Sequence, residues 1–215
     1  MRSFCLALVG FVALLVSHSS GHAGTNGRSI QLVVDNSAAL QGAEIAESLK
    51  RQMSFHVSEL RKRSEFKTAR VHIISINNPR NLWVGTPVEL FRNGAGVPGQ
   101  IAVVQNGCAD VLGALDQLLL NVELERPERV DVYVFSSLIH TGSPCDKVTI
   151  ELPQPVPKNL DLSKLAKENI RVRFYFVHPL QVRPWAEAIR QAGLKSWSIH
   201  DEETTRTILR RGLEP

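Results

Sequence analysis

The chain has 215 residues, of which 43% are hydrophobic and 21% are charged, and this balance excludes an intrinsically disordered protein. Its formal net charge of +4 is small, and the basic residues are scattered among acidic ones, which argues against a nucleic-acid-binding protein. The length suits one domain with a sizeable core after removal of a short leader.

The N-terminus carries the clearest local signal. Arg2 precedes an apolar run at residues 4–16, and Gly21-His22-Ala23 provides small residues at the two positions that a signal peptidase reads. The run is shorter than the roughly 20 residues of a membrane-spanning helix, although an uncleaved anchor is the alternative. We therefore expect an extracytoplasmic protein, periplasmic or secreted, with no membrane span after cleavage. The predicted parts are a signal peptide at 1–23, a linker at 24–28 and a domain at 29–215.

The domain alternates β-rich apolar runs with segments whose apolar residues recur every three or four positions. The predicted strands are 29–35, 70–76, 129–135, 170–177 and 196–200, and the predicted helices are 43–60, 110–122, 160–169, 184–192 and 204–211. Glycine and proline break up residues 80–106, where we expect two short strands, 88–92 and 100–105, in a hairpin-like excursion. Strands separated by helices imply an α/β fold with a mainly parallel central sheet and helices on both faces.

Three loop sequences carry a family resemblance. Asp35-Asn36-Ser37 ends the first strand, Cys108 precedes the helix 110–122, and Ser136-Ser137 follows the strand 129–135. In position and order these loops resemble those of the von Willebrand factor type A (VWA) family, over residues 29 to about 211. In that family they hold a divalent cation, whose open position takes an acidic partner. The resemblance implies a VWA-like fold with binding residues Asp35, Ser37, Ser136 and Ser137.

The sequence departs from the family's metal-binding pattern at three positions. Ala39 stands in place of the second serine of the first loop, Cys108 in place of a threonine, and Ser137 in place of an aspartate. Since Mg²⁺ and Ca²⁺ need several oxygen ligands, we predict neither a constitutive metal nor a cofactor. Aspartate and serine after a strand also bond the local turn, which we favour for Ser37 and leave open for Asp35.

Another doubly wound domain, Rossmann-like or flavodoxin-like, is the structural alternative. It would show the same alternation of strands and helices. No G-x-G-x-x-G sequence follows the first strand, so a dinucleotide-binding site is not indicated.

Cys108 and Cys145 are the two cysteines of the predicted mature chain. An exported location favours a disulfide between them. The competing interpretation is a hydrolase in which Cys108 is the nucleophile, His140 the base and Asp35 the orienting acid, and a small-molecule binder at the same crevice is a third.

Trp83 lies in the glycine-rich excursion, where an exposed aromatic side chain could anchor a partner, while a buried loop anchor is the alternative. The function that the sequence favours is a non-enzymatic interaction or scaffolding module. Its partner would be an unidentified protein, as for a soluble subunit of an envelope or secretion assembly.

Overall fold

The computed structural model describes residues 27–37, 58, 61–93, 97, 107–141, 145 and 150–211. The strands in this part are β1 (Arg28–Val34), β2 (Arg70–Ser75), β3 (Arg80–Gly85), β4 (Arg129–Phe135), β5 (Ile170–Val177) and β6 (Ser196–Asp201). The helices are α2 (Pro87–Asn93), α4 (Val111–Glu125), α5 (Pro179–Gln191) and α6 (Glu202–Arg211), with short 3-10 helices η1 (Ser64–Phe66) and η3 (Leu162–Leu165). The predicted signal peptide, the strand 100–105 and, apart from residue 58, the helix 43–60 lie outside the described residues.

The six strands form one sheet in the order β3-β2-β1-β4-β5-β6. All neighbouring pairs are parallel except β2 and β3. A turn over residues 76–79 joins these two strands, and so short a connection can form only an antiparallel pair. The predicted α/β fold with a mainly parallel sheet is confirmed.

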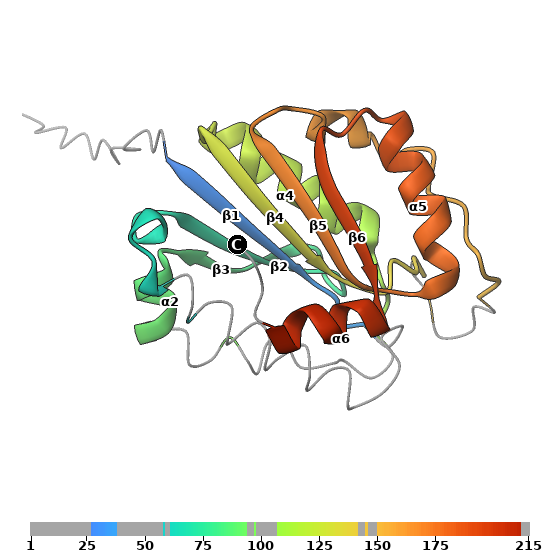
Figure 1. The fold of residues 1–215 in the computed structure, drawn as a ribbon, viewed down its shortest axis with the longest axis horizontal. Helices are drawn as coiled ribbons and strands as arrows, with labels where there is room; N and C mark the ends of the chain where they lie inside the picture. The colour runs from blue at the N-terminus through green and yellow to red at the C-terminus, as the bar shows by residue number, and fades with distance from the viewer. Residues whose placement is uncertain are drawn as a thin grey trace, which may run out of the picture.

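Helices cover both faces of the sheet (Figure 1). On one face, α4 and α5 bury an apolar cluster whose largest side chain is Trp185. On the other face, α2 and α6 contribute Leu90 and Ile208 to a second cluster, and α6 crosses the ends of β5 and β6. In the described part of the chain, no helix combines the length and apolar character needed to cross a membrane.

A polar cluster interrupts the packing between α4 and the first three strands. Asn121 of α4 donates to Gln31 of β1 at 3.1 Å and exchanges two hydrogen bonds with Asn81 of β3 at 2.9 and 3.0 Å. Glu125, one turn later, accepts from Arg70 at 2.7 Å and lies 2.9 Å from Nε2 of His72. These bonds satisfy the buried side chains of Gln31 and Asn121, which would otherwise be costly, whereas Nδ1 of His72 has no hydrogen-bond partner among the described residues.

The structure corrects the predicted strand at 88–92, because these residues lie within helix α2. Thr86 and Glu89 form a reciprocal cap, in which the backbone N–H of Thr86 donates to Glu89 Oε2 at 2.7 Å and that of Glu89 donates to Thr86 Oγ1 at 3.2 Å. Pro87 begins the helix, where its missing N–H costs nothing. Residues 80–85 form β3, a strand that the glycine-based interpretation missed.

Two predicted helices also need correction. In place of the predicted helix 160–169, the chain forms only the short 3-10 helix η3. Asp161 caps it by accepting from the backbone N–H of Ser163 at 3.2 Å, and within η3 the buried residues are Leu162 and Leu165. Helix α5 begins at Pro179, not at Pro184, because His178 caps it by accepting from the N–H of Leu180 at 3.3 Å. Pro184 lies inside this helix.

Candidate functional site

The candidate site lies where β1, β4 and β5 end. Parallel strands bring their carboxyl ends to one edge of the sheet, and we call this the carboxyl edge. Asp35 follows β1, and its backbone N–H donates to the carbonyl of Phe135 at 2.9 Å. Ser136 follows β4, and its N–H donates to the carbonyl of Tyr175 at 3.0 Å. Asp35 and Ser136 thus continue the ladder beyond the strands, which places their side chains together.

Asp35 is fully buried, and both of its side-chain oxygens accept hydrogen bonds from serines. Ser37 donates to Oδ1 through its hydroxyl at 2.5 Å and its backbone N–H at 3.0 Å. The hydroxyl of Ser136 donates to Oδ2 at 2.7 Å. The turn-bonding role favoured for Ser37 is therefore what this geometry shows, and Asp35 is the acceptor that closes the turn.

Burial raises the pKa of Asp35 above its usual range, and the hydrogen bonds from Ser37 and Ser136 oppose this shift. A raised pKa means that the surroundings do not fully replace the water that would stabilise the carboxylate. Among the described residues, no group of three or more histidine, cysteine, aspartate and glutamate side chains is arranged to hold a metal ion.

Ser136 and Ser137 shape the loop after β4. The Ser136 hydroxyl, besides donating to Asp35, accepts from the N–H of Leu138 at 3.0 Å, and the Ser137 carbonyl accepts from His178 N–H at 3.1 Å. Leu138 adopts a positive φ of 58°, a backbone conformation that residues other than glycine rarely take. Four of the five predicted binding residues, Asp35, Ser37, Ser136 and Ser137, are buried, and the hydrogen bonds among them and to Leu138 hold the edge loops together.

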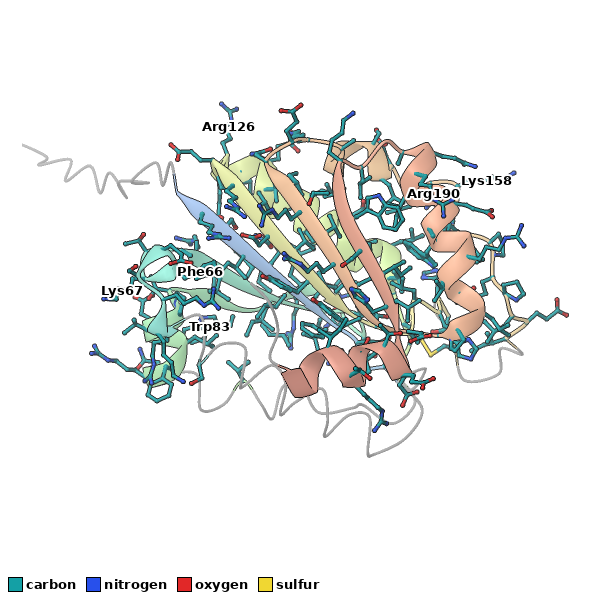
Figure 2. The ribbon with its side chains drawn as sticks, in the orientation of Figure 1. Phe66, Lys67, Trp83, Arg126, Lys158 and Arg190 are labelled. Carbon is teal, nitrogen blue, oxygen red and sulfur yellow. A yellow bond between two sulfur atoms is a disulfide. The ribbon has the colours of Figure 1, made fainter. Side chains whose placement is uncertain are left out.

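A disulfide joins Cys108 to Cys145, with their Cα atoms 5.3 Å apart, which confirms the predicted pairing. Next to it, Ala109 donates from its N–H to Thr141 Oγ1 at 2.6 Å, and the N–H of Thr141 donates to the carbonyl of Ala109 at 3.0 Å. The loop before α4 and the loop after β4 are thus tied by the disulfide, one backbone hydrogen bond and one hydrogen bond to a side-chain hydroxyl. The disulfide is drawn as a yellow bond in Figure 2.

Two glutamines complete the carboxyl edge, and no sequence pattern indicated their role. Gln154 accepts from the N–H of His140 and donates to its carbonyl, both at 2.9 Å. Gln181 of α5 accepts from the N–H of Gln154 at 2.8 Å and donates to the carbonyl of Leu138 at 3.1 Å. The loop after β4 is therefore fixed from two sides by side chains distant in sequence.

Comparison with known proteins identifies structural neighbours only. No protein-family model matches the chain, and no curated protein matches it. The solved structures that resemble it include the pilus adhesin SpaC from Lactobacillus rhamnosus GG, at 14% identity and a TM-score of 0.61 over 86% of this chain and 30% of that chain. The human COPII-coat protein Sec24c matches at 10% identity and a TM-score of 0.55, over 86% of this chain and 31% of that chain.

Proximal thread matrix protein 1 from the mussel byssus also matches, at 12% identity and a TM-score of 0.52, over 87% of this chain and 45% of that chain. The chain spans less than half the length of each of these neighbours. At such low identity the likeness shows the fold alone. The chain shares an α/β fold with these proteins, and its six-stranded, mainly parallel sheet is consistent with the predicted VWA-like architecture.

The hydrolase arrangement is not assembled in this structure. The sulfur of Cys108 is bonded to Cys145, so it is not a free nucleophile. The oxygens of Asp35 accept from serines, and in the described residues no hydrogen bond joins Asp35 to His140. Nδ1 of His140 is buried without a hydrogen-bond partner within the same residues.

Trp83 lies in β3, an edge strand of the sheet, and not in a loop as expected. It is partly buried against the second apolar cluster, and its cross-strand neighbour is Ile73 of β2. In Figure 2, Trp83 lies near α2, on the other side of the molecule from the disulfide. The structure therefore does not bring Trp83 together with the other predicted binding residues.

Proposed function

We propose that this chain is an exported, non-enzymatic protein-interaction or scaffolding module, a VWA-like domain with a degenerate metal-ion-dependent adhesion site. One observation carries the proposal: Asp35, which begins the family's metal-binding motif, is buried and held by Ser37 and Ser136 of the same chain. Its oxygens hold the edge loops, and the disulfide between Cys108 and Cys145 adds a covalent tie. The carboxyl edge is thus held together by hydrogen bonds and a disulfide within the chain.

The descriptions of the structural neighbours support a binding or assembly role. They name a pilus adhesin, a thread matrix protein and a coat protein. The disulfide supports an oxidising, extracytoplasmic location, because such bonds persist mainly outside the cytosol.

Leu180 gives a direct test of the carboxyl edge. It lies in the first turn of α5, beside the loop after β4, and 53% of it is exposed. If a partner binds this edge, Leu180→Glu should abolish its capture from the exported fraction, since a charge would have to be buried against the partner. Leu124→Glu is the matched control, because Leu124 is 73% exposed at the opposite end of α4. Loss of capture by both variants, or by neither, would refute a partner site at this edge.

Export is a second prediction. Arg2, the apolar run at 4–16 and Gly21-His22-Ala23 lead us to expect cleavage after Ala23. N-terminal sequencing of the protein recovered outside the cytoplasm should begin at Gly24. Recovery of the chain with Met1 intact, or in the membrane fraction, would contradict export by a cleaved signal.

Metal binding gives a third prediction. A cation present at about 100 times its dissociation constant would add about 2.7 kcal/mol to the free energy of unfolding and raise Tm clearly. Because the oxygens of Asp35 are taken by serine donors, we expect millimolar Mg²⁺ or Ca²⁺ to leave Tm unchanged relative to a chelator-treated sample. A saturable rise in Tm that Asp35→Ala removes would mean that the site still binds a cation.

A further inference from the structure

The sheet face opposite α4 and α5 carries a group of charged side chains near the amino ends of its strands. In the parallel register, Arg28 of β1 lies beside Arg129 of β4, and Asp131 of β4 lies beside Arg171 of β5. Residues two apart on a strand share a face, so Arg173 of β5 belongs to the same group. We call Arg28, Arg129, Asp131, Arg171 and Arg173 the arginine face.

One carboxylate on this face is shared by several guanidinium groups. Asp131 is completely buried, and its Oδ2 lies 2.5 Å from Nε of Arg28 and 3.7 Å from Nε of Arg129. Its Oδ1 lies 4.0 Å from Nη1 of Arg173. Arg171 has no ion pair with any described residue, and it is partly exposed. Four arginines and one aspartate leave three positive charges on this face, in a chain whose formal net charge is +4.

Two of the guanidinium groups are held in place on aromatic rings, and one of them retains an unused donor. Arg28 stacks over Phe66, labelled in Figure 2, at 4.0 Å from the ring centroid, and Arg173 lies 5.4 Å from the ring of Tyr133. Nη1 of Arg173 is buried and has no hydrogen-bond partner in the described part of the chain. Guanidinium groups fixed on aromatic rings lose little side-chain entropy when they bind an anion.

The chemistry of this face favours carboxylates as its ligands. Asp131 shows that these arginines already hold a carboxylate, and a planar guanidinium matches that group with two parallel donors. The aromatic rings of the face, Phe66 and Tyr133, are buried beneath the arginines and offer no surface for stacking nucleic-acid bases. Arg129 and Arg171 are partly exposed at this end of the sheet, and their excess positive charge suits an extended acidic segment.

We propose that the arginine face binds an acidic peptide segment of a partner protein. This surface lies at the amino ends of the strands and is distinct from the carboxyl edge, so the proposal does not rest on the function proposed above. Arg129, whose side chain is 40% exposed, and Arg171 make the first contacts with glutamate or aspartate side chains. Arg28 and Arg173 supply the fixed positive potential behind them.

The test is a direct binding measurement with a fluorescently labelled peptide of alternating Glu and Ser. Fluorescence anisotropy should show binding that weakens as salt is raised, because exposed charges are screened. Arg129→Gln combined with Arg171→Gln should raise Kd roughly tenfold, since each exposed ion pair contributes up to about a factor of five. These two residues are chosen because Arg28 continues to hold Asp131 in the variant.

Arg183→Gln combined with Arg190→Gln on α5 is the matched control, because it removes the same charge from another surface and should leave Kd unchanged. An equal loss in the control, equal binding of a Gln-Ser peptide, or no change in the arginine-face variant would overturn the proposal. Anionic vesicles and a DNA oligonucleotide are measured in parallel. Tighter binding of either through Arg129 and Arg171 would also overturn the assignment to an acidic peptide. Thermal unfolding confirms that each variant is folded.

Discussion

Replacing both Cys108 and Cys145 with serine should lower the free energy of unfolding by about 4 kcal/mol, since the disulfide closes a loop with a sequence separation of 37. Most of this loss comes from the unfolded chain, which gains freedom when the loop is opened. The folded edge keeps its other ties, because Ala109 and Thr141 remain bonded at 2.6 and 3.0 Å. Urea unfolding of the mature protein measures the change.

Reduction provides the control for this prediction. Wild-type protein in excess reductant should unfold at the same urea concentration as the double serine variant, and the variant should not respond to reductant. Thiol counting on the denatured, unreduced protein should find no free thiol. A free Cys108 that reacts faster with alkylating reagents as pH rises would contradict the disulfide and revive the nucleophile interpretation.

The buried parallel strands were predictable because valine, isoleucine and aromatic residues are concentrated in them. β4 and β5 occupy the predicted ranges, β2 and β6 differ from prediction by one residue at one end, and β1 begins and ends one residue earlier than predicted. A strand covered by helices on both faces is rich in apolar side chains, and few other structures impose that pattern. The positions of these strands along the chain also fixed which loops meet at the carboxyl edge.

The errors occurred where local chemistry outweighed composition. Glycine and proline suggested an irregular excursion around residues 80–106, yet Thr86-Pro87-Val88-Glu89 is a capping box that starts a helix. This signal was present in the sequence. In contrast, no sequence signal indicated that the predicted helix 160–169 would be shortened. Leu162 and Leu165 are buried in the first apolar cluster by tertiary packing, which sequence periodicity does not report.

The candidate site was predictable in position but not in role. The rule that parallel strands end at one edge places Asp35 near Ser136, and the structure gives 2.7 Å between their oxygens. The sequence could not show that these side chains would be buried and bonded to each other. It also could not reveal Gln154 and Gln181, since a side chain that bonds a distant backbone leaves no periodic pattern.

The polar cluster between α4 and the sheet is a second feature that periodicity could not reveal. Gln31 lies in a strand that reads as apolar, and it is completely buried. Its Nε2 donates to Ser29 Oγ at 2.8 Å, while its Oε1 accepts from Asn121 at 3.1 Å. Asn121 therefore stands at the centre of the cluster, since it bonds side chains of β1, β3 and α4.

Asn121→Ala should lower the free energy of unfolding by about 3 kcal/mol, because it leaves the buried Gln31 Oε1 and the amide of Asn81 without their partner. Gln117→Ala is the control on the same helix: Gln117 is partly exposed and donates to Asn121 at 3.1 Å, so its loss should cost under about 1 kcal/mol. Asn121→Leu combined with Gln31→Leu should recover much of the stability, since a buried polar pair replaced by apolar groups leaves no unpaired atom between them. Urea unfolding measures the free energy of unfolding of the three variants relative to the unmodified protein. If Asn121→Ala unfolds like Gln117→Ala, the cluster is hydrated in solution and its hydrogen bonds do not stabilise the packing of α4 on the sheet.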